Sequence, residues 1–138
     1  MFKLTIVTPE KRILLNQDVE EVTLPGFKGE LNILSGHSPL ITTLETGVLK
    51  WKVPGKEIQE QAAISWGYCH VSPEGVNVLA DIAKLSTEID LSVATQTIGT
   101  LESKLGSDSL TDEEWAQIQR DLALARASVE AVPATQKH

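Results

Sequence analysis

Residues 22–40 decide the fold of this chain, and they read VTLPGFKGELNILSGHSPL. Three glycines and two prolines punctuate three short apolar runs in this stretch. Glycine tolerates positive φ and proline fixes φ near −65°, so these residues predict tight turns between short strands.

The predicted turns carry polar tips. Lys28 and Glu30 surround the first turn, and Ser35, His37 and Ser38 surround the second. We expect two adjacent strand ends to form one exposed ridge, on which the carboxylate of Glu30 and the imidazole of His37 lie close together. Such a ridge predicts a surface that contacts a partner.

Short apolar runs with a period near two continue on both sides of this stretch. They predict strands at 2–6, 13–15, 22–24, 31–33, 40–44, 48–53, 58–64, 68–71 and 76–80. Many short strands without intervening helices favour an antiparallel β-sandwich or barrel. In the run 48–53, one face should be wet (Val48, Lys50, Lys52) and the other buried (Leu49, Trp51, Val53). We interpret Trp51, Trp66 and Tyr68 as core or rim residues.

The hydrophobic period changes beyond a short linker at 82–88. Asp90 is a predicted N-cap for a helix at about 91–105, and Thr111 and Glu114 form a predicted capping box for a second helix at about 112–132, which Pro133 should end. One face of each helix is apolar at spacings of three and four: Leu91, Ala94, Ile98, Leu101 and Leu105 in the first, and Trp115, Ile118, Leu122, Ala125, Val129 and Val132 in the second. The sequence therefore predicts a β domain at 1–86 and an antiparallel helical hairpin domain at 87–138.

Composition narrows the classes of function. The chain has 138 residues, 41% of them apolar, and a formal net charge of −7, which argues against nucleic-acid binding. A single cysteine excludes an intramolecular disulfide and fits a reducing compartment. No apolar stretch is long enough to span a membrane and no signal peptide is recognisable, so we expect any membrane association to go through a partner.

Reactive groups are sparse in the sequence. The three histidines show no metal-ligand spacing, and no phosphate-binding loop or dinucleotide fingerprint occurs. Ser35 and His37 place a hydroxyl near an imidazole, but no carboxylate is placed locally to orient the ring. We therefore expect a protein that is not catalytic by itself. Two alternatives stay open: a free-standing β-sandwich module that binds a ligand or peptide, and a hydrolase that uses Ser35 and His37.

The run quoted above closely resembles the signature of the epsilon subunit of rotary F-type ATP synthases, above all in Gly29-Glu30-Leu31 and Gly36-His37-Ser38-Pro39-Leu40. Residues 7–10, Gly47, 76–81 and Ile89-Asp90 are also similar to that family, so the resemblance covers essentially the whole chain. It implies a β-sandwich of about ten strands that carries a C-terminal two-helix hairpin.

The resemblance also implies a function. It points to a non-catalytic rotor subunit of the central stalk, which couples proton-driven rotation of the c ring to the gamma subunit and to ATP synthesis. The subunit would lie peripherally on the cytoplasmic face of the bacterial inner membrane. By their positions in the motif, Glu30, Leu34 and His37 should contact the ring of c subunits, and gamma should take another surface of the sandwich and part of the hairpin.

The hairpin of this family is regulatory, and here it departs from the family in two ways. The helices can extend toward the alpha and beta subunits and inhibit ATP hydrolysis, and some members bind ATP through an Asp-x-x-Arg-Ala motif. Asp90 and Ala94 match that motif, but Val93 replaces its arginine. We therefore expect no cofactor and no strong ATP binding, with Asp90, Ala94, Arg120 and Arg126 as the residues of any weak nucleotide site.

The second departure is charge. From residue 87 onward, nine acidic residues stand against four basic ones, a net −5 out of the total −7. Inhibitory hairpins in the family tend to be basic, so we expect like-charge repulsion to weaken inhibition by this hairpin.

Overall fold

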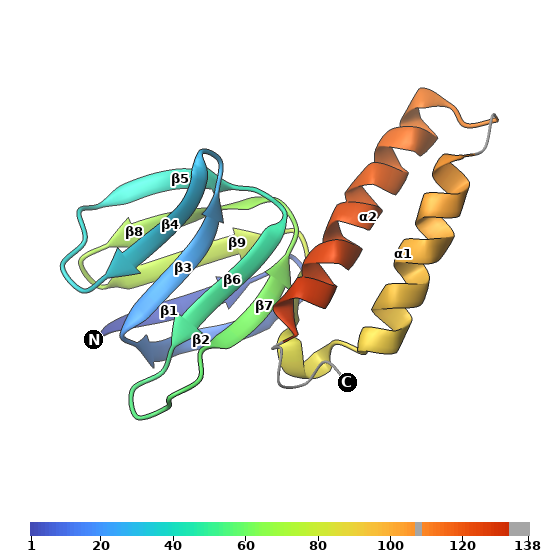
Figure 1. Ribbon diagram of the computed structural model, residues 1–138. Helices are drawn as coiled ribbons and strands as arrows, with labels where there is room; N and C mark the ends of the chain where they lie inside the picture. The colour runs from blue at the N-terminus through green and yellow to red at the C-terminus, as the bar shows by residue number, and fades with distance from the viewer. Residues whose placement is uncertain (107–108, 133–138) are drawn as a thin grey trace.

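The computed structural model describes residues 1–106 and 109–132. Ten short strands precede two helices, and Figure 1 shows the helices standing side by side against one flank of a β-sandwich. The strands are β1 (Phe2–Val7), β2 (Arg12–Val19), β3 (Glu21–Gly26), β4 (Gly29–Leu34), β5 (Leu40–Leu44), β6 (Gly47–Lys52), β7 (Glu60–Ile64), β8 (Gly67–Ser72), β9 (Gly75–Ala80) and β10 (Ala83–Leu85). A short 3₁₀ helix (Ser86–Glu88) leads to α1 (Leu91–Leu105) and α2 (Asp112–Ala131).

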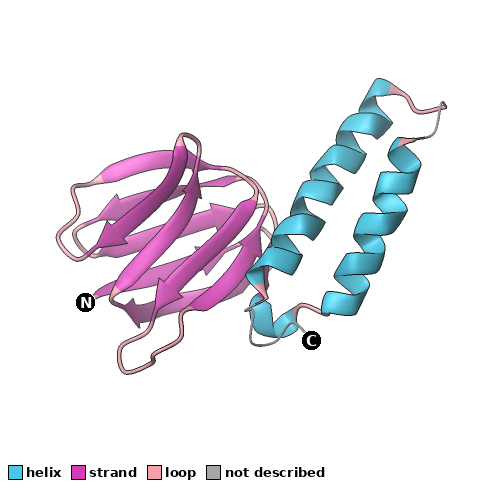
Figure 2. Cartoon of the chain, viewed as in Figure 1, coloured by secondary structure: helices cyan, strands magenta, loops and turns pink. Residues whose placement is uncertain are grey.

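Hydrogen bonds join all ten strands in the order β10-β7-β6-β3-β5-β8-β9-β1-β2, with β4 on the other edge of β3. The sheet folds over between β3 and β5, where Gly26 and Leu44 are the single register pair. This corner produces the two layers that Figure 2 shows in magenta. The pairings are antiparallel as predicted, except that β1 runs parallel to β9.

Turn residues explain the β3–β4 hairpin and the loop that follows β4. Gly29 and Gly36 have φ of 121° and 85°, values that side chains with a Cβ rarely adopt. Pro25 and Gly26, however, end β3 instead of forming the turn, which Phe27 and Lys28 occupy. The glycines therefore mark the turns correctly, with a shift of one to two residues in the first.

The interior between the layers is almost entirely apolar. Its fully buried members include Leu4, Ile6, Val22, Leu24, Leu49, Trp51 and Ile64. These residues occupy alternate positions in their strands, as expected where each strand buries one face. The prediction that Leu49 and Trp51 face the core is confirmed.

The opposite face of β6 is not simply wet. Val48 is buried with Ala63 of β7 against Ala127 and Ala131 of α2. Only Lys50 and Lys52 of that face keep contact with water. The assignment of Val48 to a wet face was therefore wrong, because α2 covers this end of the sheet.

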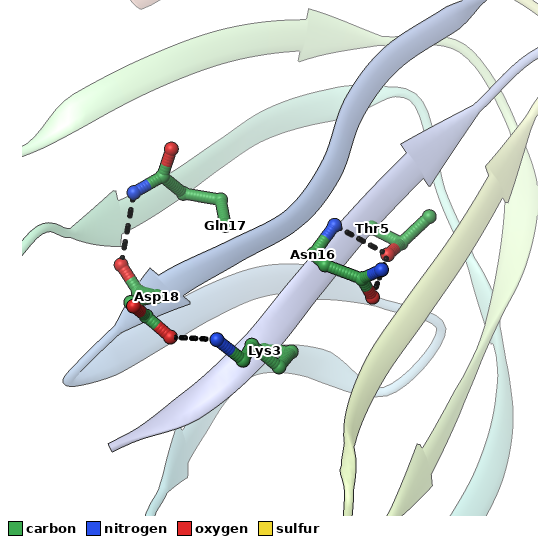
Figure 3. A network of polar contacts seen from close by, with 5 residues as sticks. All are labelled: Lys3, Thr5, Asn16, Gln17 and Asp18. Atoms are coloured by element: carbon green, nitrogen blue, oxygen red, sulfur yellow. Dashed lines mark hydrogen bonds and ion pairs between the residues drawn. The ribbon is translucent and has the colours of Figure 1, made fainter.

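A β-bulge distinguishes the exposed edge strand β2. The register between β1 and β2 shifts between Leu4 and Ile6, and Asn16 takes a positive φ of 49°. Figure 3 shows the polar contacts that hold the bulge: Thr5 Oγ1 accepts a 3.0 Å hydrogen bond from the Asn16 amide, and Lys3 pairs with Asp18. A bulged and charged edge discourages pairing with strands of other molecules.

The segment expected to be a linker is partly ordered structure. Residues 83–85 form β10 on the edge of β7, where Lys84 pairs with Ala63, and residues 86–88 form the 3₁₀ helix. Three residues are too short for a periodic signal. The free edge of β7 creates this strand, because its backbone groups need partners.

Both helix caps are confirmed. The side chain of Asp90 accepts from the Val93 amide, and Thr111 and Glu114 form the reciprocal capping box. The seam between the helices consists of Ile98, Leu101, Leu105, Leu110, Ile118 and Leu122. Trp115 does not belong to it, since 52% of its surface is exposed. Pro133 lies outside the described residues.

Candidate functional site

The residues proposed for partner contact lie on β4 and the loop that follows it. The amide of His37 donates a 3.1 Å hydrogen bond to the carbonyl of Leu34, closing a tight turn. Leu34 is 54% exposed and His37 is exposed. Both border a pocket of about 400 Å³ together with Met1 and Pro73. The N-terminus lies on the side of the sandwich away from the helices (Figure 1).

Glu30 lies at the opposite end of β4. It pairs with Pro25 beside the β3–β4 turn and stands four positions before Leu34 in β4. A strand rises about 3.3 Å per residue, so about 13 Å of β4 lies between Glu30 and Leu34. The expected ridge with the carboxylate and the imidazole close together was therefore wrong.

Glu30 and Leu34 nevertheless share a feature. Glu30, Asn32 and Leu34 alternate along β4 and are all exposed, whereas Ile33 is buried. Side chains at alternate positions face the same side of a sheet, so these three form an outward row. We call this row, continued by His37, the β4 row.

The β4 row is not arranged for catalysis. His37 Nδ1 lies 2.8 Å from the carbonyl oxygen of the adjacent Ser38, to which it can only donate. In this arrangement the ring is held by a backbone acceptor rather than by a carboxylate. Within the described residues, no group of three or more His, Cys, Asp or Glu side chains is arranged to hold a metal ion. None of the described helices is long and apolar enough to cross a membrane.

The candidate nucleotide residues divide into two groups. Asp90 and Ala94 line a pocket of about 640 Å³ between the hairpin and the sandwich, and Val93 lines it with them. Arg120 and Arg126 do not line it: Arg120 donates to Gln117 at 2.8 Å, and Arg126 lies 3.7 Å from Glu102.

The charge of this pocket disfavours a polyphosphate. Two cations, Lys11 and Lys84, line it alongside four acids, Glu10, Glu88, Asp90 and Asp121. The side chain of Asp90 is already used to cap α1. The arrangement therefore offers little neutralisation for the phosphates of ATP.

One exposed surface was only partly anticipated, because the sequence placed Trp66 and Tyr68 in the core or at its rim. Trp66 and Tyr68 are 58% and 48% exposed and border a shallow, mostly apolar hollow of about 240 Å³. Tyr68 pairs with Leu79 of β9 and with Thr43 of β5, and Ile41 of β5 is exposed beside them. We call Ile41, Trp66, Tyr68 and Leu79 the aromatic patch. The sequence signal for this surface was the alternation in β8, which places Tyr68 on the face opposite Cys69 and therefore away from the core.

The hairpin touches the sandwich through a small apolar interface. Val48 and Ala63 meet Ala127 and Ala131, flanked by Ile89 and Leu124. α1 lies outside α2 and buries only Leu101 (Figure 1). Within the described residues, no ion pair joins α1 or α2 to a strand.

Comparison with known proteins agrees with this architecture. Residues 1–86 match the family model described as "ATP synthase, Delta/Epsilon chain, beta-sandwich domain". The ATP synthase epsilon chain of Bdellovibrio bacteriovorus is 65% identical over 129 residues, which cover 94% of this chain and 92% of that relative. The epsilon chain of Geotalea uraniireducens is 37% identical and covers 92% of this chain and 88% of the relative.

Solved structures share the fold. A chain in the cryo-EM structure of the Euglena gracilis mitochondrial ATP synthase, an OSCP/F1/c-ring assembly, superposes with a TM-score of 0.80 at 25% identity, covering 96% of this chain and 81% of that one. A chain of the Tetrahymena thermophila central stalk and c ring superposes at 0.60 and 13% identity, which supports the fold alone. By its sequence along nearly its whole length and by its fold, this chain belongs to the ATP synthase epsilon chain family.

Proposed function

We propose that the chain is a non-catalytic central-stalk subunit of a bacterial F-type ATP synthase, which passes torque between the c ring and gamma. The observation that carries this proposal is the 65% identity to an ATP synthase epsilon chain over 94% of the chain. The superposition on a chain of an F1/c-ring assembly supports it. The subunit would then lie peripherally on the cytoplasmic face of the inner membrane.

The physical design suits a load-bearing adaptor. Ten strands form one hydrogen-bonded sheet closed over a core whose main members are fully buried. Such a core is close-packed and transmits strain with little compression. Its chemistry lies in surface patches rather than in a reactive cleft.

The aromatic patch is our proposed contact for gamma. Trp and Tyr dominate interface hot spots because they bury large areas while ordering few rotatable bonds. Three exposed side chains on adjacent strands (Ile41, Tyr68 and Leu79), with Trp66 from the β7–β8 connection, also exceed the scattered single residues of an ordinary surface. Trp66 thereby acquires the role of an anchor.

The β4 row is our proposed contact for the c ring. The row replaces the compact ridge expected from sequence: Glu30 at one end, Leu34 and His37 at the other. A carboxylate at one end and an apolar side chain at the other suit a polar loop that lies along the strand. Glu30 would pair there with a basic or amide group of the ring.

The hairpin is proposed to regulate hydrolysis only weakly. Its small alanine-rich interface with the sandwich allows it to leave, but its net charge of −5 opposes insertion among acidic segments of the catalytic head. ATP binding at Asp90 and Ala94 is proposed to be weak at most, because the arginines lie elsewhere.

Co-purification with a gamma subunit tests the central proposal. The full chain should be retained by its gamma subunit, and Trp66→Ala should weaken binding by at least roughly tenfold as a hot-spot residue. Ile58→Ala is the control, since it removes an exposed apolar side chain from the β6–β7 loop, which belongs to neither proposed contact surface. A chain that shows no affinity for gamma or for the F1 complex would refute the proposal.

A second experiment addresses regulation. ATP hydrolysis by the assembled complex is measured with the full chain and with a chain that ends at residue 86. We expect a small increase on truncation. A large increase would show that the acidic hairpin is a strong inhibitor.

The alternative of a free-standing binding module keeps one observation in its favour. The hollow beside Trp66 and Tyr68 is mostly apolar and could hold part of a ligand. Its volume of about 240 Å³ lies below the about 300–1,000 Å³ of typical ligand pockets. Saturable binding of a glycan or peptide without any binding to gamma would favour this alternative.

A further inference from the structure

Three charged side chains from separate elements border one pocket near the C-terminal end of α2. Glu30 of β4, Lys50 of β6 and Glu130 of α2 border one shallow pocket of about 250 Å³. Val48, which anchors α2 to the sheet, and Gly47 border the same pocket. The β3–β4 turn, the start of β6 and the end of α2 therefore come together here.

Lys50 is placed to act on α2. It lies two residues beyond Val48 on the face of β6 that α2 covers, so its side chain emerges beside the docking interface. The last turn of α2 contains no basic residue but contains Glu130. The C-terminal end of a helix carries a partial negative charge, which a nearby cation stabilises. Lys50 is the basic residue that borders the same pocket as Glu130.

Glu30 opposes this effect. It borders the same pocket as Lys50 and Glu130, so it attracts the cation that α2 needs and repels the carboxylate of α2. In the described residues, none of the three side chains forms an ion pair within 4 Å. Their influence is therefore a balance of nearby charges rather than a fixed bridge.

The β3–β4 hairpin packs closely against the start of β6, next to the docking site. A Cβ on Gly47 would lie 2.8 Å from Cβ of Pro25, the residue paired with Glu30. Gly47 precedes Val48 directly. The backbone next to Glu30 is thus in contact with the segment that positions the hairpin anchor.

We infer that Lys50 is an electrostatic latch for the docked hairpin and that Glu30 connects this latch to the partner that the β4 row binds. A cationic group of the partner that engages Glu30 removes both the competition for Lys50 and the repulsion of Glu130. Partner contact then stabilises the docked hairpin. The step from latch to partner rests on the proposed c-ring contact, whereas the latch itself does not.

The latch is tested on the full-length chain by thiol accessibility. Ser128 is buried on α2 and borders the pocket between hairpin and sandwich. Ser128→Cys, in a Cys69→Ala background, therefore places the single thiol where undocking exposes it. The rate of reaction with a small thiol reagent reports the undocked fraction.

We expect Lys50→Gln to raise this rate roughly two- to fivefold, which corresponds to the free energy typically lost with a single exposed charge interaction. Lys52→Gln is the matched control: the same charge change two residues along the same face, next to Glu20 and away from the pocket. Glu30→Gln should lower the rate, and high salt should reduce both effects. Equal rates for Lys50→Gln and Lys52→Gln, or a faster rate for Glu30→Gln, would overturn the latch.

The coupling is tested in the assembled complex. Assembly should slow thiol reaction in the parent chain, and by a smaller factor in Glu30→Gln, whose charge is already removed. Equal slowing in both refutes the coupling while the latch stands. Failure of the chain to assemble at all concerns the proposed function and is seen separately, by co-purification.

Discussion

The indole Nε1 of Trp51 donates a 2.9 Å hydrogen bond to Oε2 of Glu60, its partner in the β6–β7 register. Trp51 is fully buried, and the other oxygen of Glu60 accepts from Lys56 at 2.9 Å. The carboxylate of Glu60 thus accepts the hydrogen bond of the buried indole N–H with one oxygen and forms an ion pair with Lys56 at the surface with the other. This side-chain hydrogen bond adds to the backbone pairing of β6 and β7, the two strands that contact α2.

Glu60→Ala should lower the free energy of unfolding by about 1–3 kcal/mol, because the buried indole N–H loses its acceptor. Urea unfolding measures the change. Glu57→Ala, which removes an exposed acid from the loop that precedes β7, should change stability by less than about 0.5 kcal/mol. Equal unfolding midpoints for the two variants would contradict the importance of this hydrogen bond.

Gly99→Ala should stabilise the hairpin by about 0.5–1 kcal/mol. Gly99 lies in the exposed middle of α1, and a Cβ added there meets no atom within 4 Å. The gain comes from helix propensity, because alanine loses less backbone freedom than glycine. Hydrogen exchange of α1 amides should slow correspondingly. Faster exchange would mean that α1 requires this glycine for another reason.

Val93→Arg should raise the affinity for ATP by roughly tenfold or more. Val93 is 56% exposed and lines the pocket that holds Asp90 and Ala94, so an arginine there brings a guanidinium to the phosphates. Hydrogen bonds between charged groups contribute about 1.5–3 kcal/mol. Isothermal titration calorimetry measures the gain, with Val93→Gln as the neutral control. Equal ATP affinities for the two variants would show that the acids of this pocket dominate.

The buried thiol of Cys69 should make stability fall at high pH. Burial raises the pKa of Cys69 from 9.0 to about 11, against a smaller opposing effect of a backbone hydrogen bond with Thr42. Between these values the unfolded chain releases the proton while the folded chain keeps it, so stability decreases as pH rises from 9 toward 11, by up to about 1.4 kcal/mol per pH unit.

Cys69→Ala removes this contribution. The difference in unfolding free energy between the parent chain and Cys69→Ala should therefore shrink as pH rises above about 9, as measured by urea unfolding. A difference that stays constant with pH would show that the thiol does not titrate differently in the two states.

Local chemistry alone was enough to predict much of the fold. The positive φ of Gly29 and Gly36 follows from turns that only glycine tolerates easily. The capping box of Thr111 and Glu114 works within one turn of helix, so its two residues specify it without help from the rest of the chain. Alternation similarly places Leu49 and Trp51 in the core.

The candidate site depended on contacts between distant segments. Alternation tells which side chains of a strand share a face, but it does not tell what covers that face: α2 buries Val48, whereas the face with Trp66 and Tyr68 stays open. Glu30 and His37 lie apart because β4, paired with β3, runs between them. Arg126 does not line the nucleotide pocket; its guanidinium lies near Glu102 of the neighbouring helix instead. By itself, the sequence determined the turns, the caps and the family, because each is encoded within a few residues; only the tertiary structure decided which surfaces are free, because exposure depends on elements that pack from elsewhere in the chain.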